Sequence, residues 1–316
     1  MRTRSILLLL LATAVMGGGI LWWLGQRPPQ RGAAAYQHTK AILEFGPRPP
    51  ASEGLHAVRG YLKSHLESAG WVVQAQPFER STSNGEVKFE NLRARFPNGG
   101  DPWQRPVKGL LAAHMDSKLY KDKVFLGADD AASACGAILE IADILAKESP
   151  ALAGQMELVF FDGEEALGEG ITPFDGLFGS RFYASEWRTK PDKPAFGIVL
   201  DMIGHQDLRI ALPSDTPETL RDATLAAAKA ESASANFTMA PGPIMDDHVP
   251  LNLAGIPTMD MIGNFSLGVG SDYKPIYVPW WHTPGDSLEL ISPKSLDISI
   301  RVTLRVLRGQ LQDGAK

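Results

Sequence analysis

Residues 156–165 read MELVFFDGEE, a largely apolar run that ends at an acidic turn. Such a run, bounded by a turn, predicts a buried strand over 156–161. In open α/β sheets, ligands collect in the crevice beyond the carboxyl ends of the strands. Because neighbours on an irregular turn point in different directions, Glu165 and Glu164 can divide two tasks, metal binding and proton transfer. A carboxylate in a closed pocket beside other carboxylates has a pKa raised toward neutral, as a general acid–base requires.

Predicted strands and helices alternate on both sides of this stretch. We predict strands over 71–78, 87–96, 107–113, 156–161, 196–200 and 258–262. We predict helices over 54–69, around Ile138 to Leu145, over 177–187, over 216–231, and along Leu296, Ile300, Leu304 and Leu307 with an end at Gly309. This alternation predicts an α/β fold, a single-domain three-layer sandwich with a mixed, mostly parallel central sheet flanked by helices.

Composition places the chain among globular proteins. Its 316 residues are 44% hydrophobic and 21% charged, enough to bury one large core and unlike a disordered chain. The formal net charge is −5 without long runs of either sign, so nucleic acid is not an indicated partner. The single cysteine, Cys135, excludes an intrachain disulfide. It sits among small residues in an apolar helical pattern, which favours buried packing over chemistry.

The N-terminal sequence predicts export. Arg2 and Arg4 precede an uncharged, mostly apolar stretch over 5–24, and about 20 apolar residues are needed for a helix to span a bilayer. The only tolerable cleavage site, over 12–14, falls inside this stretch, which favours an uncleaved membrane anchor over a signal peptide. The positive-inside rule then places the rest of the chain in the periplasm or another extracytoplasmic space. We therefore expect a signal or anchor over 1–25, a linker over 26–32 and a catalytic domain over 33–316.

Acidic and histidine side chains recur where predicted strands end. The four clusters are HMD at 114–116, DD at 129–130, DGEE at 162–165, and Asp201. His282 adds an imidazole from a late loop. Clusters at successive strand ends are expected to meet in space, and a mixed set of imidazole and carboxylates suits catalytic zinc, which keeps a position open for water or substrate. The alternative, that these acids only cap helices and solvate loops, fits one cluster better than four.

Five motifs in chain order give the sequence a family resemblance. They are HMDSK (114–118), FFDGEE (160–165), LFGSR (177–181), DDHVP (246–250) and WHT (281–283). At these residues the chain resembles the zinc-dependent exopeptidases, a family that contains the dizinc aminopeptidases and the animal-type glutaminyl-peptide cyclotransferases. The resemblance runs from about residue 33 to the C-terminus, is closer to the cyclotransferase branch, and implies a zinc exopeptidase-like fold.

The resemblance implies a set of zinc ligands. In the cyclotransferase branch, Asp130, Glu165 and His282 would bind a single catalytic zinc. In the dizinc aminopeptidases, the positions of His114 and Asp201 would bind a second metal, with Asp130 as the bridge. All five positions carry a suitable ligand here. The ligands alone therefore leave one zinc or two open.

The resemblance also implies roles toward the substrate. Glu164 would shuttle the proton, Asp201 and Asp246 would hold a hydrogen-bond relay, and Trp281 would shape the pocket for the substrate's N-terminal side chain. Peptides or proteins with N-terminal glutamine would be cyclised to pyroglutamate with release of ammonia. The alternative is an aminopeptidase, in which water attacks the first peptide bond with the same Glu164 as base. The DDHVP setting of Asp246 favours cyclisation, and a non-catalytic binding domain is a remote third reading.

The sequence departs from the cyclotransferase pattern at several positions. Gly-Glu-Gly over 168–170 stands where the cyclotransferases carry a tryptophan, and Asp260 stands where they tend to have a histidine. The glycine-rich stretch 263–279 looks longer than theirs and would form a lid or an altered specificity rim. Cys135 matches one half of a disulfide in animal members, but Ala113 replaces the other half.

Overall fold

The computed structural model describes residues 31–263, 265–269 and 275–313. The expected anchor over 5–24 lies outside these residues, as does most of the expected linker. Within the described ranges, no helix combines the length and the apolar character needed to cross a membrane. Arg31 and Gly32 belong to the compact unit that runs to the C-terminus, because their backbone N–H groups donate to carboxylates of Asp297 and Glu140.

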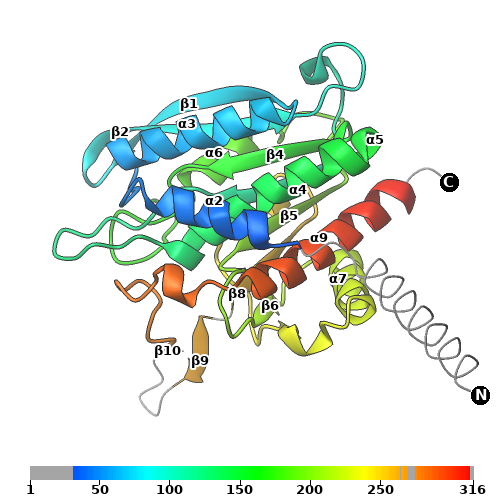
Figure 1. The fold of residues 1–316 in the computed structure, drawn as a ribbon. Helices are drawn as coiled ribbons and strands as arrows, with labels where there is room; N and C mark the ends of the chain where they lie inside the picture. Colours follow the sequence, from blue (N-terminus) through cyan, green and yellow to red (C-terminus); the bar gives the residue numbers. More distant parts are fainter. Residues whose placement is uncertain (1–30, 264, 270–274, 314–316) are drawn as a thin grey trace, which may run out of the picture. The chain divides into compact units, whose positions relative to one another are not determined.

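A mixed eight-stranded sheet forms the centre of this unit (Figure 1), in the order β1-β2-β4-β3-β5-β8-β6-β7. Its strands are β1 (Val72–Thr82), β2 (Gly85–Arg95), β3 (Gly109–His114), β4 (Met156–Phe161), β5 (Phe196–Asp201), β6 (Ile210–Leu212), β7 (Phe237–Met239) and β8 (Thr258–Gly263). The central strands β4, β3, β5 and β8 run parallel, and antiparallel pairing adds β2 with β1 on one side and β6 on the other. Strands β9 (Ser266–Val269) and β10 (Pro275–Tyr277) form a separate antiparallel pair.

Helices cover both faces of the sheet (Figure 1). The α-helices are α2 (Ala33–Leu43), α3 (Glu53–Ser68), α4 (Ala134–Glu148), α5 (Pro150–Ala153), α6 (Phe178–Ser185), α7 (Glu218–Ala230), α8 (His248–Leu253) and α9 (Pro293–Asp313). Short 3-10 turns are η1 (Pro102–Gln104), η3 (Ser234–Asn236) and η4 (Leu288–Leu290), and η2 (Ala128–Ser133) is a π-helical turn. The helices on the two faces and the sheet between them make up the three layers that the sequence predicts.

Side-chain alternation along the strands supplies the two halves of the core. Leu111 of β3 and Leu158 of β4 pack with the cluster that includes α2, α3, α4 and α9. Their neighbours Leu110 and Val159 point to the opposite face and pack with residues of α6 and α8. Successive strand residues face opposite sides of a sheet, so a continuous apolar strand must be buried on both faces. The predicted α/β three-layer fold is confirmed.

The predicted end of the last helix is wrong. Helix α9 passes through Gly309 and continues to Asp313. Leu311, beyond the glycine, is only 2% exposed, and its carbonyl accepts a hydrogen bond from Lys108. A glycine inside a helix costs about 1 kcal/mol, whereas burying a leucine contributes about 1.5–3 kcal/mol, so burial outweighs the glycine.

Candidate active site

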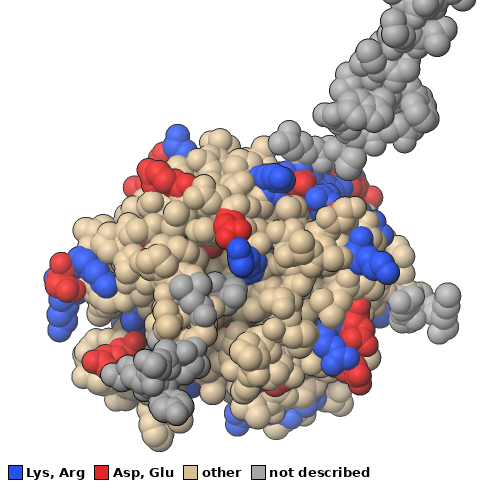
Figure 2. Space-filling model, turned by 90° about the horizontal axis from the view of Figure 1, so that it is seen from below, with Lys and Arg blue, Asp and Glu red and all other residues tan. Residues whose placement is uncertain are grey.

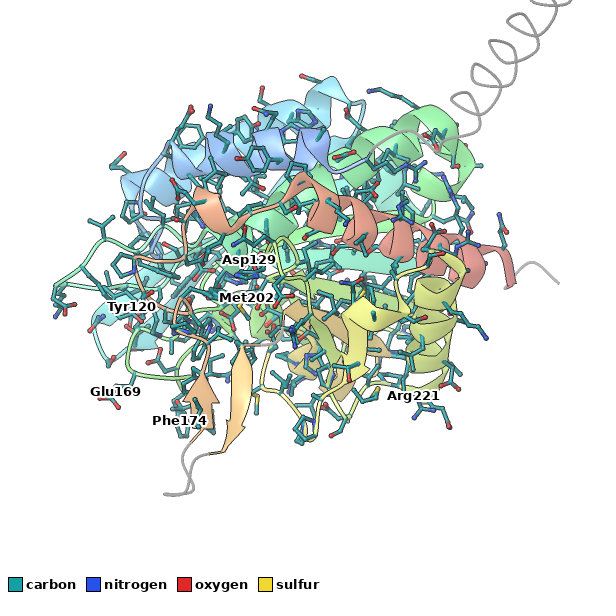
Figure 3. All side chains as sticks on the ribbon, turned by 60° about the horizontal axis from the view of Figure 1, so that its bottom comes forward. Tyr120, Asp129, Glu169, Phe174, Met202 and Arg221 are labelled. Atoms are coloured by element: carbon teal, nitrogen blue, oxygen red, sulfur yellow. The ribbon has the colours of Figure 1, made fainter. Side chains whose placement is uncertain are left out.

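The parallel arrangement of β4, β3 and β5 brings most of the predicted clusters together. His114 ends β3, Asp201 ends β5, and Glu164 and Glu165 follow β4. The remaining cluster, Asp129 and Asp130, was also predicted to follow a strand, and this prediction is wrong. Asp130 lies in η2, where its φ of −105° and ψ of 85° depart from helical values and precede α4. Asp129 and Met202, the sequence neighbours of Asp130 and Asp201, lie close together in the middle of the molecule in Figure 3 and line a common cavity.

Three predicted ligands converge as a set. His282 Nε2 lies 3.3 Å from Asp130 Oδ2 and 3.2 Å from Glu165 Oε1. Four-coordinate zinc with ligand bonds of about 2.0–2.1 Å places neighbouring ligand atoms about 3.3 Å apart. Glu165 Oε1 is buried and makes no hydrogen bond within the described part of the chain. The donor types and spacings of this set fit a zinc ion.

A second set shares one member with the first. His114 Nε2 lies 3.1 Å from Asp130 Oδ1 and 3.4 Å from Asp201 Oδ1. The two oxygens of Asp130 therefore face two different histidines. This geometry also suits a cation, so the candidate second-metal residues meet in space.

The charges of the site shift its pKa values in opposite directions. Burial raises the pKa of Asp130, but His114 and His282 outweigh burial and hold that pKa well below its usual value. Burial lowers the pKa of His282, whereas Asp130 and Glu165 raise it to a net value of about 9. Burial raises the pKa of Glu164 well above its usual value; His114 opposes this shift. Of these three groups, Glu164 is the one carboxyl whose pKa is raised, so its position favours the proton-bearing form.

Two buried aspartates position the ligand-bearing segments. Asp116 accepts hydrogen bonds from the backbone N–H groups of Glu164, at 3.1 Å, and Glu165, at 3.2 Å. Asp286 does the same for Asp129, at 2.7 Å, and Asp130, at 3.2 Å. Each carboxylate thus holds two consecutive backbone groups. Asp116 lies within the HMDSK motif, whose sequence does not reveal this role, and Asp286 was not predicted because no local motif marks it.

Lys118 is a further buried partner of a predicted ligand. Its Nζ lies 3.4 Å from Glu165 Oε2 and donates to the carbonyl of Ala166 at 3.0 Å. Lys118 is 5% exposed, so its ammonium is held within the site. Because Lys118 contacts Oε2 of Glu165, the other oxygen, Oε1, faces His282. The HMDSK motif contained this lysine, but its spacing alone did not reveal the contact.

A cavity of about 460 Å³ opens onto these groups. Its lining includes Asp130, Glu164, Glu165, Asp201, Asp246, Trp281 and His282. The ring of Trp281 stacks on that of His282, with centroids 3.9 Å apart and planes 19° apart. His282 has a left-handed backbone, with φ of 56°, which is uncommon for a non-glycine residue. The predicted catalytic and pocket residues thus share one cavity.

The departures from the cyclotransferase pattern also have a place in the structure. Glu169 and Gly170 line the cavity where the resemblance expects a tryptophan. Asp260 is fully buried, with one oxygen 3.7 Å from Nδ1 of His248. Cys135 is buried in α4, as its apolar setting predicts, and its thiol donates to the carbonyl of His114.

Comparisons with known proteins agree with this geometry. The sequence profile of peptidase family M28 matches residues 91–307. A glutaminyl-peptide cyclotransferase-like protein of Mus musculus is 30% identical over 305 residues, which cover 86% of this chain and 73% of that protein. The structure of a glutaminyl cyclase from an Acidobacteriales bacterium has a TM-score of 0.78 and 27% identity, over 92% of this chain and 98% of that one. A Zn-dependent exopeptidase of Parabacteroides distasonis has a TM-score of 0.76 and 26% identity, over 89% and 98%.

The chain belongs to peptidase family M28. The matched range contains every predicted zinc ligand, so the family match and the converging side chains concern the same part of the molecule. The family resemblance predicted from the five motifs is confirmed.

Proposed function

We propose that the chain is a zinc-dependent glutaminyl-peptide cyclotransferase, which converts an N-terminal glutamine to pyroglutamate and releases ammonia. The observation that carries this proposal is the position of Glu164, a buried carboxyl in the same cavity as Asp130, Glu165 and His282. The similarity to named glutaminyl cyclases supports cyclisation over the hydrolysis that other M28 peptidases perform.

Asp130, Glu165 and His282 would hold one zinc ion. All three line the substrate cavity, whereas His114 is absent from the described residues that line it. When bound there, zinc would supply a Lewis acid that polarises the γ-amide carbonyl of the substrate. Lys118 and Asp116 hold Glu165 in place through its side chain and its backbone N–H.

Glu164 provides the proton transfers of the reaction. Its carboxylate accepts a proton as the α-amine nitrogen forms a bond to the carbonyl carbon of the glutamine side-chain amide, which closes a five-membered lactam. It then donates this proton to the side-chain amide nitrogen, the bond between that nitrogen and the carbonyl carbon breaks, and ammonia leaves. The nucleophile belongs to the substrate itself, so the main task of the protein is orientation. A carboxyl whose pKa is raised by burial can both accept and return the proton.

Asp201 and Asp246 are proposed to hold the hydrogen-bond relay beside Glu164. Both carboxylates line the cavity and both are buried, and burial raises the pKa of each. Trp281 supplies a flat apolar wall beside His282, against which the methylene groups of a glutamine side chain can lie. These residues would orient the substrate so that its amine faces the carbonyl carbon of its own side-chain amide.

Two arylamide substrates test this proposal. A glutaminyl arylamide and a leucyl arylamide are incubated with the protein, and ammonia and free arylamine are followed separately. Cyclisation predicts ammonia from the first substrate and no arylamine from the second. Arylamine released from the leucyl substrate would instead identify an aminopeptidase.

We also propose that the catalytic domain acts outside the cytoplasm, attached to a membrane by residues 5–24. The support is the sequence pattern of two arginines followed by an uncharged apolar stretch. Membrane fractionation of expressing cells, with protease added to intact spheroplasts, tests this placement. A protein found only in the cytosolic fraction would contradict it.

A further inference from the structure

A groove leads away from the active-site cavity. It has a volume of about 400 Å³, and Ile171 and Met245 line both the groove and the cavity. The groove is also lined by Arg188, Arg181 and Leu253. We call it the Arg188 groove. Met245 directly precedes Asp246, so the groove begins beside the proposed relay.

The Arg188 groove exposes large apolar side chains. Leu253 is 75% exposed and Met245 is 56% exposed. Phe174, which follows the groove residue Pro173, is 87% exposed. Phe174 and the cavity residue Glu169 lie at the same margin of the molecule in Figure 3. Apolar side chains gathered in this way commonly mark a binding surface.

The two arginines of the groove differ in whether their side chains already have hydrogen-bond partners. Arg181 donates to the carbonyls of Thr172, at 2.7 Å, and Pro173, at 2.8 Å, and so fixes the loop that forms one wall. Arg188 is exposed, and its side chain has no hydrogen bond or ion pair with any residue in the described ranges. Arg188 therefore offers a cation to a ligand in the groove.

The carboxylates of the cavity and the arginine of the groove are complementary in charge to a peptide with a positive N-terminus and an acidic side chain a few residues later. The cavity is lined by carboxylates and suits the positive N-terminus of a peptide. The chain beyond the first residue must leave the cavity, and the groove adjoins the cavity, because Ile171 and Met245 line both. An extended chain advances about 3.3 Å per residue, so the next few residues fall along the groove.

We propose that the Arg188 groove binds the substrate residues that follow the N-terminal glutamine, and that it favours peptides with an acidic side chain among the first four residues. This inference rests on the proposed cyclotransferase function. The apolar walls contact the substrate chain and its apolar side chains, and Arg188 pairs with the carboxylate.

Tetrapeptide amides test the proposal. Each has an N-terminal glutamine and a single Glu or Lys at the second, third or fourth position, with alanine elsewhere. The amide removes the C-terminal charge, and each kcat/KM is divided by that of a glutaminyl arylamide measured with the same variant. The best acidic peptide is expected to exceed its Lys counterpart by about fivefold, the upper range for one exposed charge pair. Arg188→Glu should abolish or reverse this preference.

Arg221→Glu is the matched control, because it changes the net charge equally on α7, far from Phe174 in Figure 3. It should keep the preference for acid. Equal kcat/KM for acidic and basic peptides with the wild-type protein, or a preference that Arg188→Glu retains, would overturn the proposal. A preference lost equally in both variants would also overturn it, since general charge attraction would then explain the effect. Failure to cyclise the arylamide itself would instead contradict the proposed cyclotransferase function, on which the proposed role of the Arg188 groove rests.

Discussion

Asp130 Oδ2 lies 3.3 Å from His282 Nε2, across the position where a zinc ion fits. The opposite oxygen of the same carboxylate faces His114 Nε2 at 3.1 Å. Asp130 thus joins the set formed with Glu165 and His282 to the set formed with His114 and Asp201, of which only His114 is absent from the described cavity lining. The number of metal ions depends on which of these sets is filled.

The two histidines give a direct test of the zinc count. We expect His282→Ala to lose stoichiometric zinc, because it removes one of the three proposed ligands Asp130, Glu165 and His282. His114→Ala should retain a single zinc ion per chain. Elemental analysis of the purified, dialysed proteins measures both. Two zinc ions in the wild-type protein, with one lost in His114→Ala, would show that the dizinc arrangement is present.

Replacement of Glu164 separates metal binding from proton transfer. We expect Glu164→Gln to bind zinc like the wild-type protein but to lower kcat by about 10²- to 10⁴-fold, the usual contribution of a general acid–base. Steady-state kinetics and zinc analysis of the same sample measure the two effects. Glu86→Gln, the same change at an exposed site, is the control. Retained activity in Glu164→Gln would remove Glu164 from the mechanism.

Asp286 is expected to act on zinc affinity through the backbone. Its two oxygens accept hydrogen bonds from the N–H groups of Asp129 and Asp130, so Asp286→Ala would leave the proposed ligand Asp130 less well oriented. Loss of an outer partner of a metal ligand typically lowers metal affinity about 10- to 100-fold. Competition with a zinc chelator measures this affinity. An Asp286→Ala protein with unchanged affinity would show that the η2 turn holds its shape without Asp286.

His38 is expected to make stability depend on pH. Its Nδ1 lies 2.6 Å from the hydroxyl of Tyr61, and its ring contacts His65. Burial and the charge of His65 lower the pKa of His38 from 6.5 to about 4, against the opposing effect of Asp143. The folded pKa lies below the ordinary value, so the unfolded chain binds this proton first. The contribution of His38 is complete above about pH 6.5 and is lost as the pH falls toward about 4.

A substitution isolates this contribution. His38→Gln should lose less free energy of unfolding than the wild-type protein between about pH 7 and pH 5, because one proton-linked group is removed. Urea denaturation across this range measures the difference. His56→Gln on α3 controls for the loss of an exposed imidazole. Parallel stability curves for His38→Gln and the wild-type protein would contradict the expectation.

Some of this structure was predictable from local sequence. The apolar run over 156–161 is β4, with the same bounds, because a buried parallel strand needs apolar residues on both faces. The proposed roles of Glu164 and Glu165 also rest on their position after that strand. Gly309 misled the prediction, because the burial of Leu311 depends on tertiary contacts that a helix-stop pattern does not contain.

The supporting residues were harder to predict because their partners are distant in sequence. Asp116 holds groups 48 and 49 residues away, and Asp286 holds groups 157 and 156 residues away. No spacing rule links such positions. The parallel pairing of β3 with β4 brings Asp116 next to the turn that carries Glu164 and Glu165. The charge distribution is similarly a tertiary property, and the face in Figure 2 shows acidic and basic residues scattered among a majority of uncharged ones.

The mass of an intact peptide product tests the central claim most directly. A peptide with N-terminal glutamine is incubated with the zinc-loaded protein, and the product is measured by mass spectrometry, with Glu164→Gln as the control. Cyclisation predicts a product that keeps every residue and is lighter by one ammonia, formed by the wild-type protein only. A product shortened by its first residue would contradict the cyclotransferase account and identify a peptidase.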